Sequence, residues 1–313
     1  MTKRTSFDRN DPENDLSAGS TDSSILTRWG CRVSLASSAT DVGTRIGRST
    51  RHGAGRVRTP AFYLVTAGFL AFLAVALGES MAMVATAWGS EYAFPAHRVH
   101  HAVIGGTLTV FAATIAIQLY RPTKRVGALQ AAIAFAVAAF AVTLVASGPA
   151  AAGGLLVFLV PVLVIAALHP ARGHLVPSLE RADARLLGLA TVGAIGFAVV
   201  AAGEYASHAT LGDEHVLFGH YEFMTFALAS VALFALLSAL RPIGWRALAY
   251  AGGVVAVLFA AGSLAFPGLE QGSSLGPVAA VAVIVWAVAF VALAEHVDRT
   301  DSRDAERTAE PER

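Results

Sequence analysis

The sequence predicts an all-α, polytopic integral membrane protein, and its composition and its long uncharged stretches support this prediction. Hydrophobic residues make up 55% of the chain and charged residues only 14%, whereas soluble domains usually have about 25% charged residues. A helix needs about 20 mainly apolar residues to cross the hydrocarbon core of a bilayer. Stretches close to or above that length without Asp, Glu, Lys or Arg lie at 59–78, 99–120, 126–171, 186–203, 223–240, 247–269 and 271–294.

The stretch 126–171 is long enough for two spans. Ser147-Gly148-Pro149 and Gly153-Gly154 interrupt its middle, and Gly and Pro favour turns over helix. Dividing it there gives eight predicted transmembrane helices, at 60–87, 99–119, 126–147, 153–169, 185–205, 217–240, 245–266 and 276–296.

The other segments are polar. Residues 1–58 and 297–313 show no sustained apolar period, so we expect them to form disordered cytoplasmic tails. Residues 171–184 are expected to form a cytoplasmic linker. The only cysteine, Cys31, lies in the first tail, which excludes an intrachain disulfide and a Cys-rich metal site.

The helices form two tandem sets of four with matching landmarks. Gly78-Glu79 corresponds to Gly203-Glu204, His100 to His220, and Arg121-Pro122 to Arg241-Pro242. We therefore predict an internal repeat, with four-helix units at 59–170 and 185–296. Because each unit has an even number of helices, a pseudo-twofold axis parallel to the membrane normal is expected to relate them.

Basic residues are distributed unevenly between the connections. They gather before the first predicted helix, after the last one, and in the connections that follow helices two, four and six, whereas the alternate connections hold only Arg98. The positive-inside rule then places both termini in the cytoplasm and the Glu/His loops outside, in a multi-pass protein of the cell membrane. The predicted partner is the lipid bilayer. The chain lacks a basic aromatic surface for nucleic acid, and no protein partner is predicted.

Ionisable residues concentrate at the predicted outer helix ends. Glu79 and Glu204 are expected at the outer edge of the hydrocarbon layer, where a carboxylate is costly unless it is paired or protonated. Imidazole and carboxylate groups suit zinc, iron, copper or manganese, and imidazole also binds haem iron. The predicted metal ligands and their supporting residues are Glu79, His97, His100, His101, Glu204, His208, His215, His220 and Glu222.

Two family resemblances concern the same histidines. His97-x-x-His100-His101 resembles a histidine box of the membrane-bound fatty acid desaturases and hydroxylases, which implies a di-iron site. However, no second box of this form follows. The duplicated four-helix unit with paired histidines resembles haem A synthase in outline, but His169 and His296 fall at the opposite helix ends from His100 and His220. We therefore assign no family.

Three functional hypotheses remain. The first is a metal or haem site for redox chemistry, hydrolysis or metal handling. The second is a proton-coupled transporter that uses Glu79 and Glu204. The third is a non-catalytic membrane protein whose histidines satisfy one another or sense pH. The chain has no phosphate-binding loop and no nucleophile elbow in a suitable setting, and Ser273 and Ser274 are interpreted as ordinary turn or helix residues.

Overall fold

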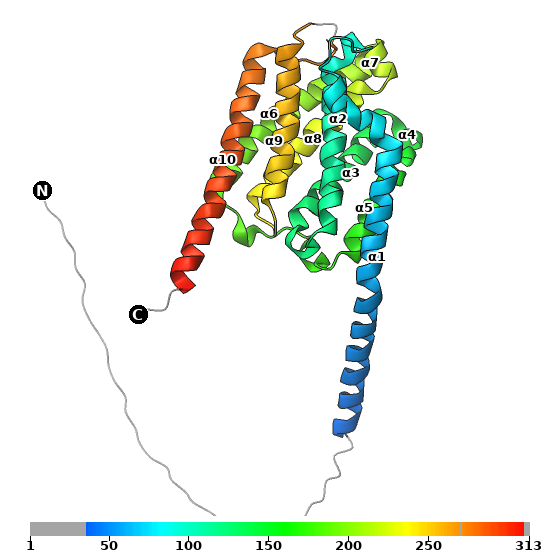
Figure 1. Cartoon of the computed structure of the whole chain (residues 1–313), viewed down its shortest axis with the longest axis vertical. Helices are drawn as coiled ribbons and strands as arrows, with labels where there is room; N and C mark the ends of the chain where they lie inside the picture. The colour runs from blue at the N-terminus through cyan, green and yellow to red at the C-terminus, as the bar shows by residue number, and fades with distance from the viewer. Residues whose placement is uncertain (1–35, 269–270, 310–313) are drawn as a thin grey trace, which may run out of the picture. The chain divides into compact units, whose positions relative to one another are not determined.

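The regular structure of the chain is helical, as the sequence predicts (Figure 1). The computed structural model describes residues 36–268 and 271–309, and no strand occurs among them. The chain divides into two compact units, residues 1–50 and residues 51–313. The second unit contains the helical bundle.

Seven helices in the described part of the chain are long and apolar enough to cross a membrane. They are α1 (Ala36–Thr86), α2 (Arg98–Ala116), α3 (Val126–Ala146), α6 (Ala184–Thr210), α8 (His220–Ala239), α9 (Arg246–Ala265) and α10 (Gly276–Ala309). The shorter helices are α4 (Gly148–Gly154), α5 (Leu156–Leu168) and α7 (Glu214–Leu217), and the 3-10 turns are Pro95–His97, Ile117–Leu119, Pro122–Lys124, Arg172–His174 and Leu179–Arg181. The predicted eighth span is present only if α4 and α5 together are counted as one membrane-spanning segment.

α4 and α5 form a broken helix with a bend of 55° between them. Gly153 and Gly154 end α4, and two consecutive glycines weaken a helix because they lose the most backbone entropy on folding. Arg58 on α1 donates hydrogen bonds to the carbonyls of Leu168 and His169, so the end of α5 is held against α1. The predicted helix 153–169 is therefore a bent pair that begins at Gly148.

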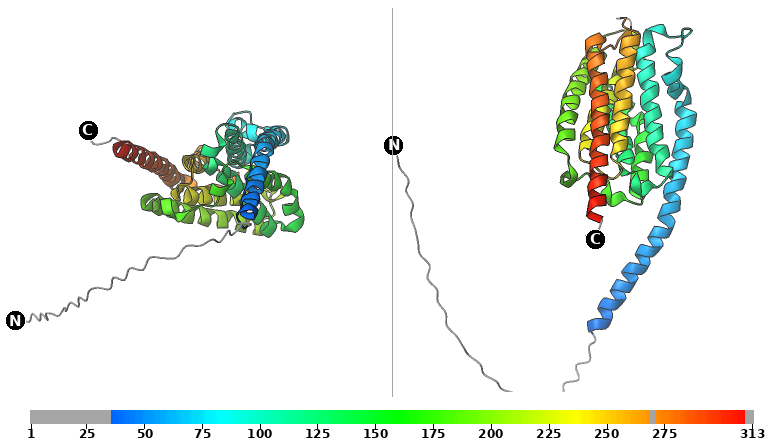
Figure 2. Two further views of the ribbon diagram at one scale, coloured as in Figure 1. Left: turned by 90° about the horizontal axis from the view of Figure 1, so that it is seen from below. Right: turned by 60° about the vertical axis from the view of Figure 1, so that its left-hand side comes forward.

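Four helices form the centre of the bundle: α2, α3, α8 and α9. Between 56% and 61% of their most apolar windows is buried, compared with 22% to 28% for α1, α6 and α10. Of the central helices, α3 and α8 are apolar around their whole circumference, which is typical of helices surrounded by other helices. In Figures 1 and 2, α10 and the part of α1 in this unit lie on opposite sides of this centre, where their outer faces suit lipid.

The two Arg-Pro corners have the same backbone conformation. Arg121 and Arg241 are the only described residues other than glycine with positive φ, at 50° and 53°. The corners also contact each other, since the Gly127 amide donates to the Ile243 carbonyl at 2.8 Å. Gly244, at φ 73°, lies against the Lys124 carbonyl so closely that a Cβ there would be 2.5 Å from the oxygen.

Both terminal helices extend further than the sequence analysis expects. The predicted tails covered 1–58 and 297–313, but α1 begins at Ala36 and α10 continues to Ala309. Residues 1–35 and 310–313 lie outside the described residues. Adding a residue to an existing helix fixes one residue for each hydrogen bond gained, so extension is much easier than nucleation. On α10, ion pairs from Arg241 to Asp301 and from Arg246 to Asp298 hold the added turns against the bundle.

Gly105 lets α1 and α2 come into backbone contact. A Cβ at Gly105 would lie 2.3 Å from the Val84 amide nitrogen and 2.9 Å from the Ser80 carbonyl oxygen. Gly193 plays a similar role between α6 and α10, against the Trp286 indole, whereas Gly188 and Gly196 have open space around them. Only some of the glycines in these helices therefore serve close packing.

Replacing Gly105 with alanine should destabilise the bundle. A methyl group cannot fit against the α1 backbone without shifting it, and such overpacking costs about 1–3 kcal/mol. The matched control is Gly196→Ala, which should be neutral or stabilising by about 0.4–1 kcal/mol because the space is open. Denaturant unfolding in detergent, followed by circular dichroism, measures both. Equal effects of the two substitutions would contradict the close approach of α1 and α2.

Candidate metal centre

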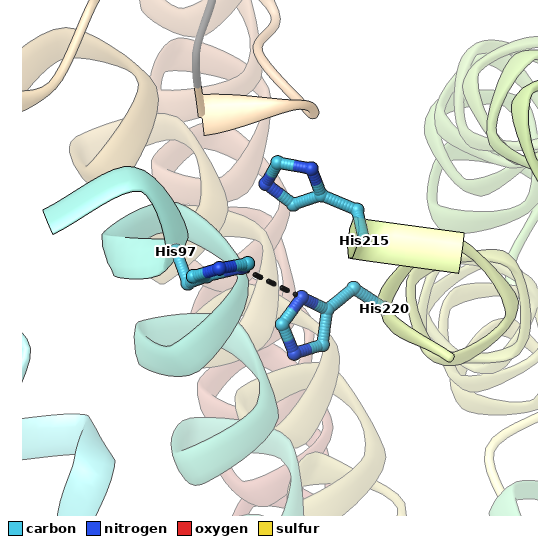
Figure 3. Close-up of side chains that lie close together, drawn as sticks. All are labelled: His97, His215 and His220. Atoms are coloured by element: carbon cyan, nitrogen blue, oxygen red, sulfur yellow. Dashed lines mark hydrogen bonds between the residues drawn. The ribbon is translucent and has the colours of Figure 1, made fainter. Parts of the chain in front are cut away.

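Five histidines meet at the end of the bundle where α2 and α8 begin. His97 ends the turn Pro95–His97, and His100 and His101 lie in the first turns of α2. His215 lies on α7, and His220 is the first residue of α8. Three separate segments of the chain therefore supply the cluster (Figure 3).

Two local features place His215 and His220. Asp213 caps α7, since its carboxylate accepts a hydrogen bond from the Val216 amide at 3.1 Å. Gly219 has φ 69°, a left-handed conformation that glycine adopts at low cost, and it separates α7 from α8. The chain thus reverses between His215 and His220 so that both rings face the start of α2.

The five imidazole rings pack against one another with almost no exposure to solvent. Ring centroids are 4.5 Å apart for His97 and His215, 4.8 Å for His97 and His220, and 5.0 Å for His101 and His220. His100 stacks on His220 at 4.9 Å. At most 7% of any of these residues is exposed, so their ring nitrogens must be satisfied inside the protein.

Three of the histidines are spaced as metal ligands would be. His97, His215 and His220 each offer a ring nitrogen, and these three nitrogens lie within 4.8 Å of one another. In the described part of the chain, this is the only group of three or more His, Cys, Asp or Glu side chains with that spacing. The shortest separation is 3.1 Å, between the Nδ1 atoms of His97 and His220.

The remaining ring nitrogens of these three histidines lie beside acceptors. His97 Nε2 is 3.3 Å from the Glu214 carboxylate. His220 Nε2 is 3.3 Å from His101 Nε2. His215 lies between two acceptors, since its Nε2 is 3.1 Å from the Ala96 carbonyl oxygen and its Nδ1 is 3.5 Å from the Asp213 carboxylate.

His100 is linked to Glu204 through a serine from the loop between α9 and α10. The Ser273 hydroxyl donates to Glu204 at 2.5 Å, so it accepts from His100 Nε2, which is 2.8 Å away. His100 Nδ1 then carries a lone pair that has no hydrogen-bond partner among the described residues. Interpreting Ser273 as an ordinary turn residue is wrong, and nothing in its sequence context distinguishes it from Ser274.

Tyr92, in the loop after α1, and Arg98, the first residue of α2, support the cluster, and neither is among the site residues predicted from the sequence. The Tyr92 hydroxyl forms a short hydrogen bond with His101 Nδ1. Burial raises the pKa of Tyr92, and the Arg98 guanidinium opposes this only in part, so the phenol stays neutral and can donate or accept. The Arg98 guanidinium itself donates to three backbone carbonyls of the loop, those of Ala87, Gly89 and Ser90.

Asp213 is held in its ionised form beside the cluster. Burial by itself would raise the pKa of this carboxyl, but hydrogen bonds from the Tyr221 hydroxyl and the Val216 amide, together with the nearby His215, lower it instead. The Tyr221 bond is 2.9 Å long. A charged acceptor therefore faces the His215 ring.

The structure brings six of the nine predicted site residues into one network: the five histidines and, through Ser273, Glu204. His208 and Glu222 form a separate pair, 3.8 Å apart, and the Glu222 carboxylate accepts hydrogen bonds from the hydroxyls of Thr143 on α3 and of Ser147 just after it. Glu79 is exposed on α1 and makes no hydrogen bond or ion pair with any residue that the structure describes. The expected convergence of Glu79 with the histidines is therefore not seen.

Comparison of the chain with protein-family models, with curated proteins and with solved structures finds no match. The fold and the site define the chain only as a multi-pass, membrane-type helical protein with a histidine cluster that could hold a metal ion.

Replacing Ser273 with alanine should destabilise the protein by about 1–3 kcal/mol, because it leaves the buried Glu204 carboxyl and His100 Nε2 without their shared partner. The neighbouring exposed Ser274→Ala is the control, and it should change the stability by no more than about 0.5 kcal/mol. Thermal unfolding in detergent compares them. If the control costs as much as Ser273→Ala, the bridge between α6 and α2 does not contribute.

Proposed function

We propose that the protein is a membrane metalloprotein in which His97, His215 and His220 bind one transition metal ion. The observation that carries this proposal is the convergence of three buried imidazoles from three chain segments, with ring nitrogens within 4.8 Å of one another. Concentrating so many imidazoles in an apolar bundle costs free energy unless their nitrogens are well paired, and a bound cation would satisfy three lone pairs at once.

The separations suit an ion of the size of zinc. Two nitrogens bound to a tetrahedral ion at 2.0–2.1 Å lie about 3.3 Å apart. His97 Nδ1 and His220 Nδ1 are 3.1 Å apart and need almost no movement. His215 would turn its ring to bring one nitrogen inward, and Figure 3 shows that ring facing the other two.

The second nitrogen of each ligand can keep its hydrogen. With Nδ1 of His97 on the metal, its Nε2 donates to Glu214, and with Nδ1 of His220 on the metal, its Nε2 donates to His101. With Nε2 of His215 on the metal, the hydrogen moves to Nδ1, which faces Asp213. Such outer partners fix the tautomer and orientation of metal-bound histidines and make them stronger ligands.

Three histidines are also the ligand count of metal sites that keep an open position for chemistry. Neutral imidazole suits zinc, copper and iron, and it leaves the charge of the ion undiminished. His100 Nδ1, which is buried and unpartnered, is the candidate for a fourth ligand. Haem is supported less well, because two axial nitrogens on opposite faces of a porphyrin are about 4 Å apart with the ring between them.

The proposed topology follows the sequence prediction. We place the histidine cluster at the outer face of the cell membrane and both termini in the cytoplasm, because the arginines gather at the opposite end of the bundle. The proposed repeat of residues 59–170 and 185–296 has two supports: the matching left-handed conformations of Arg121 and Arg241, and the stacked rings of His100 and His220. The environments of Glu79 and Glu204 differ, so the repeat does not extend to that pair. The same difference gives less support to the hypothesis of a proton-coupled transporter, which would use both carboxylates.

The proposal predicts one metal ion per chain in the parent protein, and loss of that metal in His97→Ala, His215→Ala and His220→Ala. His208→Ala and His174→Ala should retain it, since His208 lies outside the group and His174 is exposed in another loop. Elemental analysis of detergent-purified protein, reconstituted with zinc, copper, iron or manganese, measures the content, and an optical spectrum tests for haem.

Two results would overturn the proposal: no stoichiometric metal in the folded parent, or equal losses in all five variants. A haem spectrum would replace the metal ion with haem. If neither metal nor haem is bound, proton flux in liposomes with parent and Glu204→Gln protein becomes the next measurement.

Removing the carboxylate partner of His97 should weaken metal binding without removing a metal ligand. Glu214→Gln is expected to lower metal affinity by about 10–100-fold, which is typical when the carboxylate behind a metal-bound histidine is lost. The control is Glu91→Gln, an exposed residue of the loop after α1. Competition with a chelator of known affinity gives the two constants. If Glu214→Gln leaves the metal affinity unchanged, Glu214 is not the hydrogen-bond partner of a metal-bound His97.

A further inference from the structure

An apolar cavity of about 390 Å³ lies next to the histidine cluster. It is bounded by α1, α2, α3 and α8, and by Leu155 at the junction of α4 and α5. His101 and His220 are among its lining residues, whereas His97 and His215 are not. A volume of this size falls within the range of small-molecule sites.

The lining combines aromatic rings with a few neutral polar groups. Ser80 and the two histidines supply the polar side chains, and none of the described lining residues is Asp, Glu, Lys or Arg. The nearby Arg98 guanidinium is already bound to backbone carbonyls. The rings belong to Phe111, Phe135, Phe158, Phe218, Phe223 and Phe226.

The cavity borders the flank of the bundle. Leu77 on α1 and Phe158 on α5 line it and are also partly exposed. Phe158 and Phe72 of α1 have ring centroids 5.9 Å apart, so α1 and α5 meet at this flank. A ligand dissolved in the bilayer would have to part these side chains to enter the cavity here.

We propose that this cavity binds the ring of a lipid-soluble quinone, whose oxygen would replace the 3.3 Å contact between Nε2 of His101 and Nε2 of His220 and form hydrogen bonds to these two nitrogens. Phenylalanine rings suit a flat aromatic head because offset and edge-to-face contacts between rings are favourable. An imidazole has one donor and one acceptor nitrogen, so the pair can meet either a carbonyl or a hydroxyl oxygen. The lack of a cation in the lining disfavours fatty acids and phospholipids, whose head groups are anionic.

This inference goes beyond the proposed metal site and does not require it. The metal site uses His97 and His215, which do not line the cavity, and the cavity uses residues of α3 that do not approach the metal site. His220 is the one residue that the two sites share. The sites can therefore be removed separately.

The test is saturable binding of decylubiquinone to the purified full-length chain. Ala139 lines the cavity and is 6% exposed, so Ala139→Phe should fill the space and weaken binding at least tenfold. Val137 lies two residues earlier on the same helix and is 45% exposed, so Val137→Phe adds the same bulk outside the cavity and should bind as the parent does. Ala136→Leu is a milder filling variant, for use if Ala139→Phe does not fold.

Two further comparisons separate the possible outcomes. Decanoic acid, which has a chain but no ring, should not compete with decylubiquinone. Ala139→Phe should keep its metal, and His97→Ala should keep its quinone. The proposal fails if decylubiquinone does not saturate the parent, if the filling variants bind it unchanged, or if decanoic acid competes equally well. If the parent protein binds decylubiquinone but no metal, only the proposed metal site is overturned.

Discussion

The end of the bundle that holds the histidines is organised by the need to satisfy buried polar groups. Polar groups without partners in an apolar setting cost free energy, and the penalty rises as water is excluded. Segments that contribute little apolar packing are ordered here by polar contacts: α7 by its Asp213 cap, and the loop after α9 by Ser273 and Gln271. Gln271 donates to the Pro95 carbonyl at 2.7 Å and so holds that loop over the start of α2.

The loop between α9 and α10 also fits the cluster in shape. Gly272 has φ 73°, and a Cβ there would come within 2.9 Å of atoms of both His100 and His215. Only a residue without a side chain can lie so close to the two rings in that conformation. The neighbouring Ser273 thereby reaches both His100 and Glu204, so one turn of backbone closes the cluster and bridges α2 to α6.

The sequence predicts the helical class, the approximate helix ends and the presence of histidines at the starts of α2 and α8, because long apolar stretches and helix-end residues are local signals. It also places six histidines at one end of the bundle, and the structure brings five of them together while His208 pairs with Glu222. It misses Ser273, Tyr92 and Asp213, whose roles arise from loop conformations that leave no periodic pattern. The expected convergence of Glu79 with the histidines is not seen for a related reason. The position of a residue near a helix end sets its depth in the bilayer but not the direction in which its side chain points.

The break between α4 and α5 is also beyond sequence patterns. A glycine pair is compatible with a loop between two spans, with a bend, or with an unbroken helix, and the packing of α5 against α1 decides between them. Here the bend places Leu155 beside the apolar cavity. The two glycines of the break, Gly153 and Gly154, are themselves exposed, whereas Leu155 is turned towards the protein.

The row of imidazoles from His101 through His220 to His97 ends at Glu214, whose side chain is 57% exposed. Each imidazole can take up a hydrogen on one nitrogen while it gives up a hydrogen from the other. In the metal-free protein, the row therefore joins the interior of the bundle to its water-facing rim by hydrogen bonds. A metal ion bound to Nδ1 of both His97 and His220 would take the place of the middle hydrogen bond, so metal binding would interrupt this path for protons.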